Sequence, residues 1–82
     1  MKSNNREIVI QEISDVFWEE GVTFHSSMLG EPTMSLGVDS LAYAILVARL
    51  EQKLGIDPFT SNPDAGYPET LGDFVAAYEE AV

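Results

Sequence analysis

The chain has 82 residues, of which 45% are hydrophobic and 22% charged, a composition typical of one small globular domain. Its 14 acids and 4 bases give a formal net charge of -10, which repels nucleic-acid phosphates and anionic lipid surfaces and favours basic protein surfaces as partners. The absence of cysteine excludes disulfides and thiolate metal sites. No apolar run approaches membrane-spanning length, and residues 1–20 lack the apolar segment of a signal peptide. We therefore expect a cytoplasmic monomer that binds neither nucleic acid nor membranes.

A first helix is predicted over about residues 5–20. Asn4 and Glu7 form a capping-box-like pair at its start, and Gly21 is placed to end it. Apolar residues recur between them at helical spacing, namely Val9, Ile10, Ile13, Val16 and Phe17. The following residue, Trp18, is expected with Phe17 in the core or at its edge.

The next segment, residues 21–39, shows no sustained periodicity and is predicted to be a long loop. A structureless connection of this length usually has a function. Its apolar residues are expected to pin it to the core: Phe24, Met28, Leu29, Met34 and Leu36.

A second helix is predicted over residues 40–54, because this run contains neither Gly nor Pro. Asp39 can cap its start and Gly55 can close its end. At 100° per residue one face is expected to join the core, and it comprises Tyr43, Leu46, Val47, Leu50 and Leu54. The opposite face forms a neutral stripe of Leu41, Ile45, Ala48 and Gln52. If solvent reaches this stripe it is a candidate docking surface, whereas a covering helix would give it a structural role.

Turn-forming residues dominate the segment that follows. Asp57-Pro58, Asn62-Pro63, Gly66 and Pro68 leave room for one short helix near residues 63–67. A last helix is predicted over about residues 70–81, with Thr70 and Asp73 as its capping box. Its core face comprises Leu71, Phe74, Val75 and Tyr78. No strand pattern appears, so we predict an all-α domain with three main helices and one short helix.

Ser40 is the main candidate for chemistry because it stands at the start of a helix. Free backbone N–H groups and the positive end of the helix dipole would favour a phosphodiester on its hydroxyl. Asp39 would cap the helix and offer an acidic contact to an enzyme that modifies the serine. Alternatively, the two residues form a plain cap. A nucleophilic role is disfavoured, since His25 is the one histidine and no Gly-x-Ser-x-Gly elbow is present.

The run Leu36-Gly37-Val38-Asp39-Ser40-Leu41, followed by Leu46, Leu50, Glu51 and Gly55, resembles the acyl and peptidyl carrier proteins over roughly residues 5–81. The resemblance implies a four-helix bundle of the acyl carrier protein type. It also implies that a phosphopantetheinyl transferase moves a 4'-phosphopantetheine arm from coenzyme A to Ser40, between Asp39 and Leu41. The second helix would be the docking element, through Leu41, Ile45, Ala48, Arg49 and Gln52.

The chain departs from the fatty-acid type of carrier in its second helix. Ile45 and Gln52 stand where such members commonly have glutamates, with Arg49 beside them, so the docking face is similar to that of peptidyl carriers. The resemblance implies a non-enzymatic carrier of acyl or aminoacyl thioesters. Because neither terminus carries a mark of fusion to a larger synthase, we expect a free-standing protein in a specialised pathway. Its partners would be an activating enzyme and downstream synthases or transferases. The alternative is a small acidic interaction module without a prosthetic group. No metal is expected, because Asp57, Asn62 and Asp64 lack calcium-loop spacing.

Overall fold

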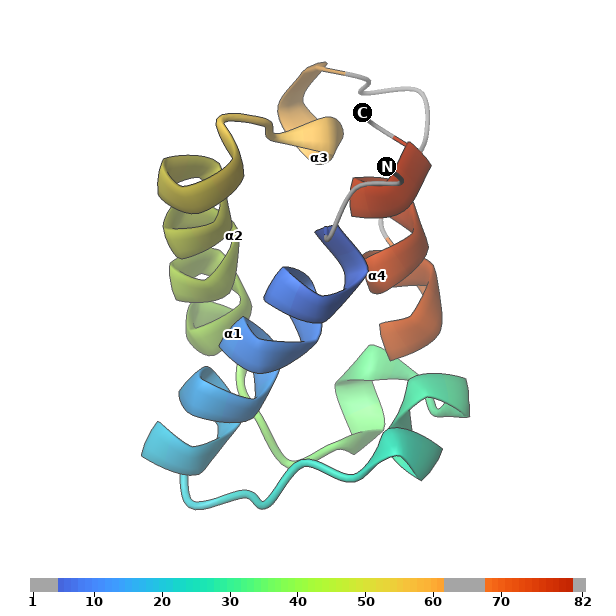
Figure 1. The fold of residues 1–82 in the computed structure, drawn as a ribbon. Coiled ribbons are helices and arrows are strands. Elements are labelled where there is room, and N and C mark those ends of the chain that lie inside the picture. The colour runs from blue at the N-terminus through green and yellow to red at the C-terminus, as the bar shows by residue number, and fades with distance from the viewer. Residues whose placement is uncertain (1–4, 62–67, 81–82) are drawn as a thin grey trace.

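The computed structural model describes residues 5–61 and 68–80 and is helical throughout (Figure 1). Three helices form the body of the molecule, namely α1 (Asn5–Glu19), α2 (Ser40–Leu54) and α4 (Leu71–Glu80). The short α3 (Pro58–Ser61) and two 3₁₀ turns, η1 (Ser26–Gly30) and η2 (Thr33–Ser35), complete it. Within the described ranges there is no β-strand, only an isolated bridge between Pro32 and Thr70. The predicted all-α class is confirmed.

The three main helices lie close to their predicted positions. α2 has the predicted bounds, and its end is set by Gly55, whose φ of 73° is the left-handed conformation that suits glycine. α1 ends at Glu19, just before Gly21 with a φ of 82°. α4 begins at Leu71 after the predicted capping box: the Asp73 amide donates to Thr70 Oγ1 at 3.0 Å, and the Thr70 amide donates to Asp73 Oδ2 at 3.3 Å.

The short helix lies at a position that was not predicted. The predicted site near residues 63–67 falls outside the described residues, whereas α3 spans Pro58–Ser61. Pro58 was interpreted as a helix breaker, but at the first helical position proline costs no hydrogen bond and its fixed φ suits the helix. Asp57 supports this start, since its Oδ1 accepts from the Phe59 amide at 3.2 Å.

The core lies between the three long helices. α1 packs against both α2 and α4, and α3 lies against α4 at the top of Figure 1. The largest fully buried side chains are Tyr78, Phe17, Phe74, Ile13, Leu46, Leu50, Leu71, Val9, Val16 and Val75. The predicted core face of α2 is therefore confirmed for Leu46, Leu50 and Tyr43, while Val47 and Leu54 are half-buried at its edges.

The segment between α1 and α2 is more ordered than predicted, because it contains η1 and η2. Its backbone is tied to the start of α4: the Thr33 amide donates to the Glu69 carbonyl at 2.9 Å, and the Leu71 amide to the Glu31 carbonyl at 3.1 Å. η1 approaches α4 so closely that a Cβ at Gly72 would lie 2.8 Å from the Leu29 carbonyl oxygen. These contacts hold the segment that precedes α2 against the start of α4.

Two predictions of burial are wrong. Met34 was expected to pin the loop but is 81% exposed, because in η2 it is Thr33 that faces the core. Trp18 was expected at the core edge but is 71% exposed, because the helical turn that buries Phe17 points the next residue away from the core.

Candidate functional site at the start of helix α2

The four residues before α2 hold Ser40 at the surface. Leu36 and Val38 are both buried and anchor the segment to the core. Between them Gly37 has a φ of 78°, and a Cβ there would meet nothing within 4 Å. The reversal at Gly37 thus returns the chain to the core at Val38, and Ser40 emerges exposed as the first residue of α2.

Asp39 caps the helix as predicted. Its backbone is extended, with φ -79° and ψ 170°, and its Oδ1 accepts from the Ala42 amide at 3.1 Å. This satisfies one of the N–H groups that a helix start leaves without an intrahelical partner. The amides of Ser40 and Leu41 remain at the positive end of a 15-residue helix.

A chain of hydrogen bonds under the first turn of α2 holds this site in place. The Tyr43 hydroxyl, which is buried, donates to the Thr33 carbonyl at 2.9 Å. The Thr33 hydroxyl in turn donates to the Pro68 carbonyl at 3.4 Å. Because Thr33 is also bonded to Glu69, the base of the site is connected to α4. These hydrogen bonds hold the start of α2 in place, and Ser40 is exposed there.

The neutral stripe on the outer face of α2 is open to solvent. Leu41 is 67% exposed and Ile45 38%, and Ala48 and Gln52 are exposed as well. The alternative that another helix covers this stripe is therefore wrong. Met34, which was expected to pin the loop to the core, is a further exposed apolar side chain in the segment leading to Ser40.

Arg49 differs from the other residues predicted for docking, because it is engaged by α1. Its Nη2 donates to both carboxylate oxygens of Glu19, at 3.0 and 3.2 Å, and this contact raises the pKa of Arg49. One turn further along α2, Lys53 Nζ lies 2.6 Å from Oε2 of the buried Glu12. Both bases of α2 thus face α1 and leave the stripe without a cation.

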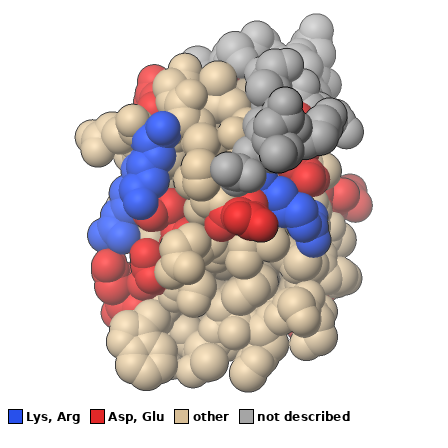
Figure 2. All heavy atoms as spheres, in the orientation of Figure 1, with Lys and Arg blue, Asp and Glu red and all other residues tan. Residues whose placement is uncertain are grey.

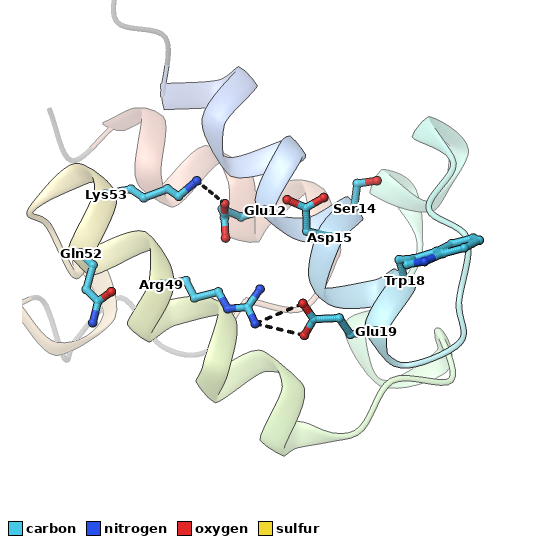
Figure 3. Close-up of a pocket in the computed structure, with 8 residues that line it drawn as sticks. All are labelled: Glu12, Ser14, Asp15, Trp18, Glu19, Arg49, Gln52 and Lys53. Carbon is cyan, nitrogen blue, oxygen red and sulfur yellow. Dashed lines mark hydrogen bonds and ion pairs between the residues drawn. The ribbon is translucent and has the colours of Figure 1, made fainter.

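These ion pairs form the floor of an open groove between α1 and α2, shown in Figure 3. The groove is lined by Glu12, Ser14, Asp15, Trp18, Glu19, Arg49, Gln52 and Lys53. In Figure 3 the Trp18 indole projects away from Arg49, at the far rim of the groove. Sequence analysis did not identify this groove, since the pairing of Glu12 with Lys53 and of Glu19 with Arg49 depends on how the helices cross.

A second, smaller cavity of about 100 Å³ lies between α2, α3 and α4. Its walls are mostly apolar and comprise Thr33, Tyr43, Val47, Asp57, Phe59, Pro68 and Phe74. Such a volume admits a few methylene groups or waters.

The geometry gives no support to a nucleophilic serine. His25 is exposed ahead of η1, and among the described residues no hydrogen bond joins it to Ser40. In residues 5–61 and 68–80 no group of three histidine or carboxylate side chains gathers that could hold a metal ion. Asp57 caps α3, and Asn62 and Asp64 lie outside the described residues.

Comparisons with protein-family models, with curated proteins and with solved structures found no match to this chain. Among the helices described, none has the length and apolar character needed to cross a membrane.

Proposed function

We propose that the protein is a carrier that holds acyl or aminoacyl groups as thioesters on a 4'-phosphopantetheine arm attached to Ser40. The observation that supports this most is the placement of Ser40: an exposed hydroxyl at the first position of a 15-residue helix, on a backbone anchored on both sides. When bound, the arm supplies the terminal thiol on which an acyl or aminoacyl group is carried.

The residues around Ser40 fit such a group. Ser40 Oγ would form the phosphodiester with the phosphopantetheine of coenzyme A, and the bond to the nucleotide phosphate would break. The hydroxyl proton would pass to a base of the transferase. The amides of Ser40 and Leu41 would face the phosphodiester anion, and the helix dipole would stabilise its charge.

The exposed stripe of α2 supports a role in docking. Leu41 and Ile45 offer apolar contact beside the attachment point, and both cations of α2 are directed to α1. A partner would therefore recognise this face by shape and apolar contact more than by charge. This supports the peptidyl-carrier type of surface over the acidic surface of fatty-acid-type carriers, in a specialised pathway.

The second candidate is an acidic interaction module that never receives the arm. The exposed Met34, Leu41 and Ile45 favour it as well, because apolar surface serves any docking protein. The two functions differ only in whether Ser40 is modified.

An intact-mass spectrum after incubation with coenzyme A and a promiscuous phosphopantetheinyl transferase separates them. We expect the mass of one phosphopantetheine group to be added to the wild-type protein and nothing to Ser40→Ala. Ser35→Ala is the matched control, since Ser35 is exposed nearby and its hydroxyl donates to the Pro32 carbonyl at 2.9 Å. Modification of the Ser40→Ala protein at another serine, or an unmodified wild type, would overturn the proposal.

A further inference from the structure

The exposed indole of Trp18 contributes little to the core. It is 71% exposed, whereas the aromatic residues Phe17, Tyr43, Phe74 and Tyr78 are all buried in the core. A polar residue at this position of α1 would leave the core packing unchanged. Large amphipathic side chains of this kind are the ones that most often anchor protein interfaces.

The surroundings of the indole are acidic. Asp15 lies three residues before Trp18 on the same side of α1, where it is exposed and accepts from Gln11 Nε2 at 3.1 Å. Glu19, the next residue along α1, is exposed as well. Arg49 is the base nearest to them in the groove, but both oxygens of Glu19 hold it, and Figure 3 shows the indole directed away from it. The face around Trp18 therefore combines an open π surface with the carboxylate of Asp15, which forms no ion pair among the described residues.

We propose that this face of α1, consisting of Trp18 and Asp15 with the paired Glu19 at its margin, is a second docking surface that receives a basic segment of a partner protein. An arginine or lysine side chain of the partner lies on the indole, and its charge lies beside Asp15. Burial of the indole supplies apolar contact, and the carboxylates supply attraction and orientation.

Charge decides against the other occupants of an exposed tryptophan. A nucleobase could stack on the indole, but its phosphates would meet these carboxylates and a chain of net charge -10. An anionic lipid surface is repelled in the same way. A second copy of the chain brings the same net charge to the contact, so self-association on this face is opposed. A basic protein segment is the occupant that is stabilised both by contact with the indole and by the negative charge.

This surface is separate from Ser40 and does not depend on the proposed arm. Its first test uses the intrinsic fluorescence of Trp18, the chain's one tryptophan. Because the indole is open and its surroundings acidic, the ratio of the caesium to the iodide quenching constant should be higher for Trp18 than for free N-acetyltryptophanamide at equal ionic strength. An equal or lower ratio, or a rise in shielding with protein concentration alone, would overturn the proposal.

The second test measures binding of a hexa-arginine peptide by calorimetry to four proteins: wild type, Trp18→Ala, Asp15→Asn and Glu31→Gln. Trp18→Ala keeps the net charge, so the expected weakening, about tenfold, reports the indole itself. Asp15→Asn and Glu31→Gln each remove one negative charge from an exposed side chain, and Asp15→Asn should weaken binding several-fold more.

Thermal melts of the same preparations control for folding, and Trp18→Ala should melt as the wild type does because its side chain contributes little to the core. Wild-type affinity in Trp18→Ala, or equal losses in Asp15→Asn and Glu31→Gln, would show diffuse attraction to an acidic protein and would overturn the proposal.

Discussion

Asp39 gives two contributions that substitution can separate: a hydrogen bond to the Ala42 amide and a negative charge beside Ser40. Replacement by alanine removes both. Loss of a cap of this type costs about 1 kcal/mol, which in a domain of this size lowers the Tm by roughly 4–8 °C. Replacement by asparagine keeps an oxygen acceptor for the amide and removes only the attraction of the charge to the helix dipole. That attraction is worth about 0.5 kcal/mol at an exposed position, or roughly 2–4 °C.

The two variants therefore predict different patterns in two measurements on the same preparations. Melts should rank wild type above Asp39→Asn, and Asp39→Asn above Asp39→Ala. If the Asp39 carboxylate also contacts the phosphopantetheinyl transferase, modification at limiting transferase should slow about tenfold in both variants alike, because both lack the charge. If Asp39 only caps the helix, the asparagine protein should be modified at the wild-type rate.

Glu51→Gln is the matched control, since it removes one charge from an exposed residue of the same helix at the opposite end. A negative charge near a helix C-terminus is unfavourable, so this change should leave the Tm the same or slightly higher. An alanine variant that melts with the wild type would contradict the cap seen in the structure. If the asparagine variant is modified at the wild-type rate, the Asp39 carboxylate does not contact the transferase and Asp39 acts only as a helix cap.

Three further results are expected. Ile45→Glu should fold and still accept the arm, since Leu46 on the core face is untouched, while loading by the protein's own activating enzyme falls about tenfold or more; loading that is unchanged, or that only follows unfolding, would exclude docking through this stripe. Added sodium chloride should raise the Tm, because 14 acids face 4 bases and salt screens their repulsion, and a Tm that stays level or falls would contradict this. Burial raises the pKa of Tyr78, so the contribution of its neutral phenol to stability is complete below about pH 10 and is lost as pH rises above that value. Tyr78→Phe removes a buried hydroxyl that has no hydrogen-bond partner among the described residues, so this variant should be as stable as wild type at pH 7. In alkaline melts the Tm of Tyr78→Phe should fall less than that of the wild type.

The sequence was most informative where several local signals agreed. α2 has its predicted bounds because an N-cap at Asp39, an uninterrupted helical run and a left-handed Gly55 all indicate the same helix. The reciprocal bonds of Thr70 and Asp73 follow from the same kind of local chemistry. The position of α3 was not predicted because Pro58 was interpreted only as a residue that interrupts helices. Proline interrupts a helix in its interior but is favoured at its first position, where Pro58 lies.

Helical phase, applied to α1 as it was to α2, would have identified both Trp18 and Glu12. Val9 lies near the middle of the buried face of α1. Trp18 is nine residues further on, which at 100° per residue places it half a turn away, on the opposite side of the helix. Glu12 falls at the edge of that face, and it is 3% exposed. Hydrophobicity alone had assigned Trp18 to the core, although its phase is that of a surface residue.

The ion pairs between α1 and α2 could not be derived from the sequence in the same way. Arg49 and Glu19 are 30 residues apart, and only the angle at which the two helices cross brings them together. The same crossing explains why the two proposed docking surfaces differ in chemistry. Arg49 and Lys53 lie one turn apart on the side of α2 that faces α1, so they neutralise Glu19 and Glu12 there, and Figure 2 shows basic and acidic side chains gathered beside one another at the left of the molecule.

The outer side of α2 is left with neutral side chains, while the outer side of α1 keeps Asp15 beside an open indole. A partner of the first surface has to match its apolar shape, whereas a partner of the second has to bring positive charge. If both surfaces act as proposed, raising the ionic strength should weaken hexa-arginine binding at Trp18 steeply and change loading through Ile45 little. An equal salt dependence of the two measurements would mean that α1 and α2 present one diffuse acidic surface instead.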